Sequence, residues 1–292
     1  GLVFFLMLRR PPGSTQGRSS AASDVYKRQT YQCRLAYNDT MTASLASSAV
    51  AGAALRLGPL PPEHTIEYTS AIHLDDGQAI RFGNTSASDD LTDSVSEIVG
   101  AVALLMNNPY GSPKIQSMDF DARIRTDSIS SHLWSIDVVD PTIKPGEDIE
   151  VNVVIESYRA QKKKYQITLP VPKSVAPGKY GLMLCGAQEY ERFLAKTVPC
   201  RFIATNYQTL VEALNLALNI PRTRLYCILV LPPEGITLDK AELPDLPGTK
   251  SVVLQSDKRA LRVQPYPHWI EKTIETGTVI SDREIVPIVV EE

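Results

Sequence analysis

The stretch Ile149-Glu150-Val151-Asn152-Val153-Val154-Ile155 decides the fold of this chain, because apolar residues recur at positions 149, 151, 153 and 155. Such a period of two is typical of a β-strand that buries one face. The same period runs through four other segments, namely 118–124, 132–138, 165–169 and 180–184. Pro145-Gly146 and Pro177-Gly178 mark turns between strands. We therefore expect an immunoglobulin-like β-sandwich over residues 113–200.

The region before this sandwich, residues 30–112, mixes helical and strand patterns. The expected elements are a helix over 40–57, a hairpin of strands 65–74 and 78–82, and a second helix over 89–107. Thr40 is expected to cap the first helix, which Gly58-Pro59 ends. Asp75-Asp76-Gly77 is the expected hairpin turn, and Pro109 stops the second helix. These elements predict an α+β unit of two helices and a hairpin.

The region after the sandwich, residues 201–292, predicts a C-terminal α/β unit. Asn206 is expected to cap its helix, and Pro287 is expected on an edge strand. The expected elements are a helix over 207–219, a buried strand over 226–231, and strands over 251–254, 260–263 and 278–290. The whole chain is therefore expected to be α+β and mostly β, with a central sandwich flanked by small α/β units.

Residues 1–29 differ from the rest of the chain. The apolar run at 2–8 could pass for the core of a signal peptide, but Arg9 and Arg10 follow it, whereas basic residues should precede it. The segment, above all 19–29, resembles translated sequencing-adapter read-through. That resemblance implies that residues 1–29 are foreign, disordered and outside the fold, and that the authentic N-terminus is missing from the sequence.

Composition limits the classes of function. The 292 residues are 43% hydrophobic and 22% charged, which is ordinary globular usage. No apolar run reaches the length of about eighteen residues that a membrane-spanning helix needs. Without residues 1–29, which hold five basic residues and one acidic residue, 25 basic and 32 acidic residues remain, a net charge of −7. This acidic balance argues against nucleic acid or an anionic membrane as a partner.

The four cysteines, Cys33, Cys185, Cys200 and Cys227, do not indicate a metal site. No CxxC pair occurs, and no histidine stands near a cysteine at zinc-ligand spacing. Buried free thiols are the favoured interpretation. A disulfide between Cys185 and Cys200 is an alternative if the chain is extracytoplasmic.

Two charged groups invite a binding hypothesis. The carboxylates of Asp75-Asp76, Asp89-Asp90 and Asp93 could suggest a metal site or a catalytic pair. Turn chemistry explains Asp75-Asp76, and the dipole at a helix start explains the others; calcium-loop spacing is absent. The basic run Gln161-Lys162-Lys163-Lys164 is expected at a solvated hairpin tip.

The histidines are His64, His73, His132 and His268, and none stands in a nucleophile motif. No GxSxG sequence occurs. His132 is expected on an apolar strand face together with Trp134, as a core or rim histidine. In Tyr266-Pro267-His268-Trp269, aromatic–proline packing is the favoured interpretation. We therefore expect no catalytic, cofactor-binding or metal-ligating residue in this chain.

Several short segments, in this order, carry a resemblance to a family. They are the small-residue helix at 40–57, Pro62-Glu63-His64-Thr65, 104–110 (LLMNNPY), 139–147 (VDPTIKPGE), Tyr158-Arg159 and Pro177-Gly178-Lys179-Tyr180. Residues 37–292 thereby resemble the C-terminal region of planctomycete-like bacterial proteins that carry a SpoIVB-type serine peptidase domain. The resemblance implies a peptidase domain upstream, with a serine in a Gly-Met-Ser-Gly-Ser-Pro-like loop and a partner histidine. Neither motif has a counterpart here, so no catalytic residue transfers.

The function expected from this resemblance is that of a non-catalytic accessory or scaffold region in a larger secreted protein, with the upstream peptidase domain as partner. An alternative is a stand-alone secreted or cell-surface module that binds protein or carbohydrate through its loops. A third hypothesis, a hydrolase that uses His132 or His268, would need a serine and a carboxylate beside one of them.

Overall fold

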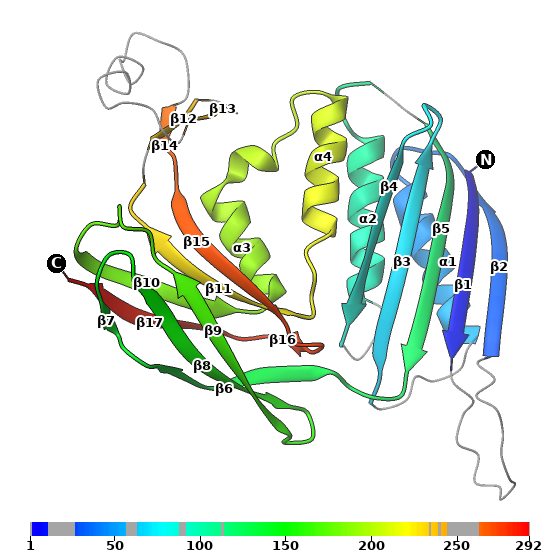
Figure 1. The fold of residues 1–292 in the computed structure, drawn as a ribbon. Coiled ribbons are helices and arrows are strands. Elements are labelled where there is room, and N and C mark those ends of the chain that lie inside the picture. The colour runs from blue at the N-terminus through cyan, green and yellow to red at the C-terminus, as the bar shows by residue number, and fades with distance from the viewer. Residues whose placement is uncertain are drawn as a thin grey trace, which may run out of the picture. The chain divides into compact units, whose positions relative to one another are not determined.

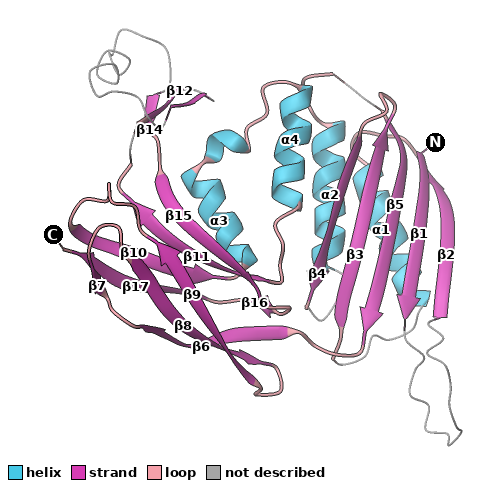
Figure 2. Cartoon of the chain, viewed as in Figure 1, coloured by secondary structure: helices cyan, strands magenta, loops and turns pink. Residues whose placement is uncertain are grey.

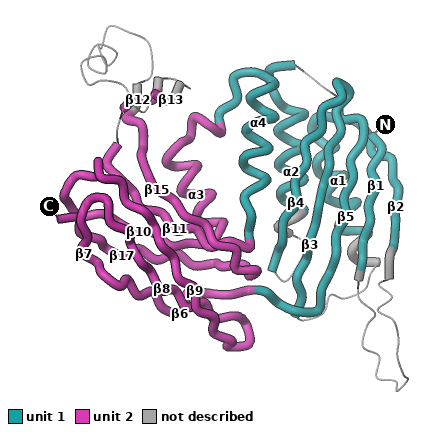
Figure 3. The backbone as a smooth tube through the Cα atoms, viewed as in Figure 1, with its two compact units in different colours: residues 1–129, 203–222 teal, residues 130–202, 223–292 magenta. Residues whose placement is uncertain are grey.

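The computed structural model describes residues 2–10, 27–56, 63–87, 92–111, 114–233, 235–238, 241–243 and 263–291. The chain divides into two compact units (Figure 3). Unit 1 comprises residues 1–129 and 203–222, and unit 2 comprises residues 130–202 and 223–292. Strands outnumber helices in the drawing (Figure 2), and the prediction of an α+β chain that is mostly β is confirmed.

Unit 1 is built on one five-stranded sheet with the order β2-β1-β5-β3-β4. Its strands are β1 (Leu2–Arg10), β2 (Lys27–Leu35), β3 (Thr65–Leu74), β4 (Ala79–Ser86) and β5 (Ile115–Arg125). β1 runs parallel to β5, and the other neighbouring strands are antiparallel. Three helices cover one face of this sheet (Figure 1), and they are α1 (Thr42–Arg56), α2 (Thr92–Met106) and α4 (Tyr207–Leu218).

β1 lies inside this sheet, between β2 and β5. Alternate side chains of β1 point into the core under the helices and are almost completely buried, namely Leu2, Phe4, Leu6 and Leu8. The prediction that residues 1–29 are disordered and outside the fold is therefore wrong for 2–10 and for the start of β2; residues 11–26 lie outside the described part of the chain. Residues 2–8 are apolar without interruption, which is typical of a strand inside a sheet, and pairing with β2 and β5 on either side fixes it there.

α4 belongs to unit 1, although the sequence predicts it in a separate C-terminal unit. Its apolar residues join the core of the unit 1 sheet, and they are Leu210, Val211, Leu214 and Leu218. Asn206 caps it as predicted, because its side chain accepts a hydrogen bond from the backbone N–H of Thr209 at 2.8 Å. The helix pattern is local, but the sheet that the helix covers comes from residues far earlier in the chain.

The local signals in unit 1 are mostly confirmed. The hairpin turns at Gly77, whose φ of 84° suits glycine, and Asp76 Oδ1 accepts from the Gln78 N–H at 2.9 Å. The cap of α1 differs from the prediction, because the Asn38 side chain accepts from the N–H groups of Thr40 and Met41. α2 ends at Met106, before Pro109, while its expected start at 89–91 and the expected end of α1 at Gly58-Pro59 lie outside the described residues.

Unit 2 contains two larger sheets that share one core. The first has the order β15-β11-β10-β17-β7, and the second has the order β16-β6-β8-β9. The strands of the first are β7 (Thr142–Ile143), β10 (Gly178–Cys185), β11 (Arg224–Leu231), β15 (His268–Glu275) and β17 (Arg283–Val290). Those of the second are β6 (Ser130–Val138), β8 (Asp148–Ser157), β9 (Lys162–Pro170) and β16 (Val279–Ile280). Residues from both sheets form a single buried cluster, so the sheets pack face to face.

The observed units correct the predicted boundaries at 113 and 200. β5 pairs with β1 and β3, so it belongs to unit 1 and not to unit 2. β10 pairs with both β11 and β17, and β11 pairs with β15, so these later strands share a sheet with β10 and do not form a separate C-terminal unit. Pairing between distant strands is not visible in the period of either strand. Pro287 lies on β17, which pairs with β7 only through Val289 and Val290, so that edge is largely open.

Smaller elements complete unit 2. They are α3 (Ala187–Thr197), the short 3-10 helix η1 (Pro199–Arg201), and a three-stranded sheet of β12 (Ile236–Leu238), β13 (Ala241–Leu243) and β14 (Val263–Pro265). The strands predicted at 251–254 and 260–263 lie outside the described residues, apart from Val263 in β14. α3 packs on β11 through the stacked rings of Tyr190 and Tyr226, whose centroids are 4.0 Å apart.

A bulge in β6 changes which of its residues face the core. Trp134 is the extra residue, because Leu133 and Ser135 pair with consecutive residues of β8. Leu133 packs on the core, whereas Trp134 and His132 are exposed. The prediction that His132 and Trp134 lie on the apolar face of this strand is therefore wrong, since a bulge shifts the alternation by one residue.

Candidate functional site

A groove with a volume of about 740 Å³ lies in unit 1, on the sheet face opposite the helices. All five strands contribute to its lining. The side chains that point to this open face are Thr30 from β2, Phe5 and Met7 from β1, Asp119 and Asp121 from β5, Thr69 and Ala71 from β3, and Arg81 from β4. A volume of this size lies in the range of sites that bind small organic ligands.

Strand register arranges the groove in two rows that cross the sheet. In the first row, Asp119 lies opposite Phe5 on β1 and opposite Ala71 on β3. In the second row, Asp121 lies opposite Met7 and Thr69 in the same way. Each row therefore has an apolar side chain on β1, a carboxylate in the centre and a small residue on β3.

The small residues explain why a hollow forms beside the carboxylates. Gly83 on β4 lies opposite Thr69 on β3, and a Cβ atom at Gly83 would come within 2.9 Å of both Thr69 Cγ2 and the Tyr68 carbonyl oxygen. Glycine is therefore required where β4 passes Thr69. Arg81, one row away, and Asn219, whose Nδ2 donates to the Arg81 carbonyl at 3.1 Å, form the rim.

Each central carboxylate has a partner at the edge of the groove. Asp119 Oδ2 lies 2.9 Å from His73 Nε2, and Asp121 Oδ2 accepts from Arg9 at 2.7 Å. Both aspartates are partly exposed, with 51% of the Asp119 side chain accessible. Water-exposed ion pairs of this kind contribute little to stability, so the carboxylates can exchange partners with a ligand at small cost.

The four histidines lie in different surroundings. His73 borders the groove through its contact with Asp119. His64 is buried, and His268 is half-buried at the start of β15. His132 is exposed, with its ring 6.3 Å from the ring of Trp134. Trp269, next to His268, meets Phe193 edge-on with ring centroids 5.5 Å apart, so Phe193 is its aromatic partner.

The acidic residues singled out in the sequence hold local structure where the chain is described. Asp75 Oδ1 accepts from the Lys114 N–H at 3.0 Å, and Asp76 holds the hairpin turn. Asp89 and Asp90 lie outside the described residues, and the side chain of Asp93 also lies outside them. Over the ranges that the structure describes, no group of three His, Cys, Asp or Glu side chains is placed to hold a metal ion.

All four cysteines are free thiols, so Cys185 and Cys200 do not form a disulfide. Cys185 and Cys227 are buried in neighbouring strands, but Cys185 pairs in register with Tyr226 rather than with Cys227. Successive residues of a strand point to opposite faces, so these two thiols lie on opposite faces of the sheet. Burial raises the pKa of each of the two thiols to about 12.

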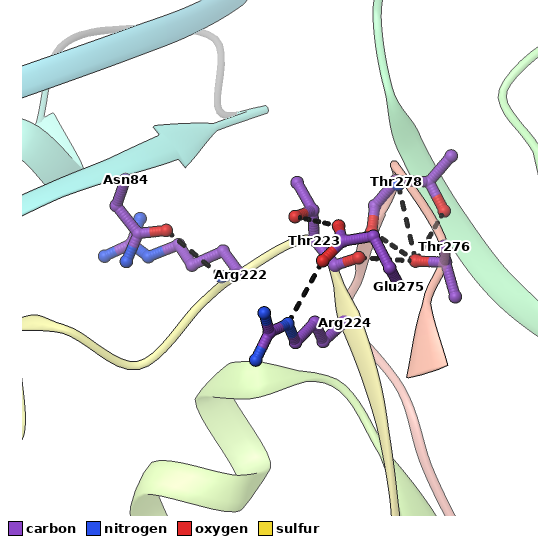
Figure 4. A network of polar contacts seen from close by, with 7 residues as sticks. All are labelled: Asn84, Arg222, Thr223, Arg224, Glu275, Thr276 and Thr278. Atoms are coloured by element: carbon purple, nitrogen blue, oxygen red, sulfur yellow. Dashed lines mark hydrogen bonds and ion pairs between the residues drawn. The ribbon is translucent and has the colours of Figure 1, made fainter. Parts of the chain in front are cut away.

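Polar contacts fix the segment that leads from α4 into β11. In unit 1, Asn84 Nδ2 donates to the Ile220 carbonyl at 2.9 Å, and Asn84 Oδ1 accepts from the Arg222 N–H at 3.1 Å. Figure 4 shows the second of these contacts. The Arg222 guanidinium pairs with Glu97, whose other oxygen accepts from Tyr68 at 2.6 Å. The end of α4 is thereby tied to β4.

A second group of contacts lies within unit 2, around Glu275. Glu275 accepts a hydrogen bond from Thr223 Oγ1 at 2.6 Å and pairs with Arg224 Nε at 3.1 Å (Figure 4). Thr276 Oγ1 donates to the Thr223 carbonyl at 2.8 Å. The hydrogen bond from Thr223, together with Arg224, lowers the pKa of Glu275.

The groove residues were not identified from the sequence. The alternation of Met118 and Phe120 with Asp119 and Asp121 predicts that the aspartates point away from the core, but it does not reveal the neighbouring strands. Phe5 and Met7 were missed because their segment was assigned outside the fold.

No helix in the described ranges combines the length and apolarity needed to cross a membrane. Comparisons with protein-family models, with curated proteins and with solved structures give no match.

Proposed function

We propose that this chain is a non-catalytic accessory region of a larger extracytoplasmic protein and that the unit 1 groove binds an extended polypeptide segment. The observation that carries the proposal is the course of the groove across all five strands, on the sheet face opposite α1, α2 and α4. Neighbouring strands are about 4.8 Å apart, so the groove spans about 19 Å. An extended chain covers that distance with about six residues.

The chemistry of the groove favours a segment with alternating apolar and basic side chains. Phe5 and Met7 offer an apolar surface at β1, and Asp119 and Asp121 offer carboxylates about two strands from the rim. A lysine or arginine side chain of the segment would lay its apolar stem on Ala71 and its charge against Asp119. Interfaces use such charge complementarity mainly for specificity.

The proposed role is binding rather than catalysis. His73 contacts Asp119 and Arg9 contacts Asp121, an arrangement that suits the binding of a charged group. The resemblance of residues 37–292 to the region beside a SpoIVB-type peptidase domain supports a role next to such a domain, in which the groove would hold a peptide for the peptidase. The immunoglobulin-like interpretation of unit 2 belongs to this proposal and rests on the common core of its two sheets.

A stand-alone secreted or cell-surface binding module is the alternative. The exposed aromatic residue Trp134 in unit 2 favours it, because tryptophan is enriched at binding interfaces. The two possibilities differ in their genetic context: an in-frame peptidase domain encoded upstream of β1 supports the accessory role, whereas a start codon and a signal peptide directly upstream of β1 support the alternative.

Peptide titration tests the groove itself. A fluorescein-labelled hexapeptide that alternates leucine and arginine should bind the chain saturably, and a hexapeptide that alternates leucine and glutamate should bind at least about tenfold more weakly, a difference of 1.4 kcal/mol. Ala71→Leu, which places a larger side chain in the hollow, should weaken binding of the leucine–arginine peptide by about tenfold. Glu284→Gln, which removes an exposed carboxylate from β17, should leave it unchanged.

Two results would overturn the proposal, because each would show that the peptides bind the chain nonspecifically. They are equal affinity for both peptides, and an equal loss of affinity for the leucine–arginine peptide in Ala71→Leu and Glu284→Gln. Because Ala71 lies on the open face, the larger leucine side chain should not disturb the core. Comparing the thermal unfolding midpoint of each variant with that of the wild type checks that both variants are folded.

A further inference from the structure

The unit 1 groove contains a cation at its β4 side that has no carboxylate partner. This cation is Arg81, which is exposed and lines the groove. Both groove aspartates contact a basic residue, namely Asp119 with His73 and Asp121 with Arg9. In the described part of the chain, by contrast, no carboxylate pairs with the Arg81 guanidinium. The groove therefore offers one free positive charge to an anionic group of a ligand.

Strand register shows what surrounds Arg81 on the open face. Arg81 lies opposite Ala71 on β3, and Ala71 lies opposite Asp119 on β5. The neighbouring positions of β3 and β4 on this face hold Thr69, Gly83, His73 and Ala79. None of these side chains is acidic. The groove carboxylates stand on β5, two strand spacings or about 10 Å from β4, and a small residue lies between Arg81 and Asp119.

The groove is bounded on the side of Arg81. The segment after α4 lies along the outer edge of β4, where Asn219 Nδ2 donates to the Arg81 carbonyl at 3.1 Å. Asn84 Nδ2 ties the same segment to β4, because it donates to the Ile220 carbonyl at 2.9 Å. Asn219 also lines the groove, so it forms a wall at this end. An extended segment that crosses the sheet from β2 would therefore reach a closed end at β4.

We propose that Arg81 binds a C-terminal carboxylate, so that the groove recognises the free C-terminus of an extended polypeptide. This inference rests on the proposed function, because it names the part of a polypeptide that the groove binds. The guanidinium can donate two parallel hydrogen bonds to a carboxylate. A lysine or arginine about three residues before the terminus would reach Asp119, because an extended chain covers about 10 Å with three residues.

The charges of the groove match such a segment. Arg9 and Arg81 balance Asp119 and Asp121, and His73 adds positive charge only when it is protonated. A C-terminus that follows a basic residue likewise has one charge of each sign, in the order that faces Asp119 and Arg81. An internal stretch of leucine and arginine would supply no anion for Arg81. Charge complementarity of this kind mainly determines specificity.

Fluorescence anisotropy with two forms of one peptide tests the proposal. The leucine–arginine hexapeptide carries fluorescein at its N-terminus and ends either in a free carboxylate or in an amide. The wild type should bind the free acid at least about tenfold more tightly than the amide. Arg81→Gln should bind both forms equally, because the donors to the carboxylate are lost. Lys114→Gln, which removes an exposed lysine outside the groove, should keep the wild-type preference.

Three results would overturn the proposal. They are equal affinity of the wild type for the two forms, an unchanged preference in Arg81→Gln, and equally tight binding of an amidated hexapeptide whose last residue is glutamate. The last result would show that any carboxylate suffices. Arg81 is exposed, so Arg81→Gln should keep the wild-type unfolding midpoint, and that measurement separates loss of binding from loss of folding.

The same titrations separate this inference from the proposed function. If the free acid and the amide bind equally but the wild type still prefers the leucine–arginine peptide to the leucine–glutamate peptide, the groove binds polypeptide and only the assignment of the C-terminus is wrong. If neither form of the leucine–arginine peptide binds, the proposed function and this inference are both wrong.

Discussion

Leu6 of β1 lies opposite Phe120 of β5 in a parallel register, and both side chains are almost completely buried. This pair places the N-terminal segment inside the unit 1 sheet, beside its central strand, where it also supplies the apolar side of the groove through Phe5 and Met7. The fold of unit 1 and its proposed function therefore depend on the same nine-residue strand.

The first prediction concerns that strand. Leu6→Ala should lower the free energy of unfolding by about 2–5 kcal/mol, because it leaves a cavity in the core. Phe5→Ala, on the open face of the same strand, should cost less than about 1 kcal/mol, because Phe5 is already 39% exposed. Urea unfolding followed by circular dichroism measures both. Equal stability of Leu6→Ala and the wild type would mean that residues 2–10 lie outside the fold.

The second prediction compares two glycines. A Cβ atom at Gly186 would lie 1.8 Å from the carbonyl oxygen of Ile280, so Gly186→Ala should destabilise unit 2 by about 3 kcal/mol. Gly100 is exposed in α2 and a Cβ atom there meets nothing, so Gly100→Ala should stabilise by about 0.5–1 kcal/mol. Thermal unfolding distinguishes the two. A stable Gly186→Ala would show that β16 does not approach Gly186 as described.

The third prediction concerns acid stability. The pKa of Glu275 is lowered in the folded chain, so its contribution to stability is present above the ordinary value of 4.5 and is lost as pH falls through the lowered pKa. Glu275→Gln should therefore have a lower unfolding midpoint than the wild type at pH 7, and this difference should shrink as the pH is lowered to 3. The side chain is 59% exposed, so the effect should be small. A constant difference across this pH range contradicts the assignment.

The fourth prediction concerns thiol reactivity. The thiolate is the nucleophile, and burial raises the pKa of Cys185 and Cys227 to about 12, so both should resist iodoacetamide at pH 8. Cys33 and Cys200 are partly exposed and should be alkylated first. Mass spectrometry of the digested chain counts the modified sites. Alkylation of Cys227 as fast as Cys200 would show that the core of unit 2 opens readily.

The local sequence patterns predicted the helices and strands well, but they did not predict which distant strands pair with each other. The period of two in 149–155 correctly predicted a strand, and Asn206 correctly predicted the start of α4. The partner of each element depends on residues far away in the chain, so the sequence assigned α4 and β5 to the wrong units. The Trp134 bulge was missed for a related reason, because its extra residue is visible only against the paired strand.

The candidate site was hidden for the same physical reason. Asp119 and Asp121 alternate with buried residues, which indicates that they face outward, but many outward aspartates are merely solvated. Only the sheet order places Phe5 and Ala71 on either side of Asp119 and turns a polar strand face into a groove.

A change of charge at Asp119 tests the central claim most directly. The competition is between the leucine–arginine and leucine–glutamate hexapeptides, measured by fluorescence anisotropy on the wild type and on Asp119→Lys. If the groove holds the peptide beside this carboxylate, the wild type prefers the leucine–arginine peptide and Asp119→Lys prefers the leucine–glutamate peptide. If the preference is the same in both proteins, the peptide does not bind at Asp119 and the proposed function of the groove is wrong.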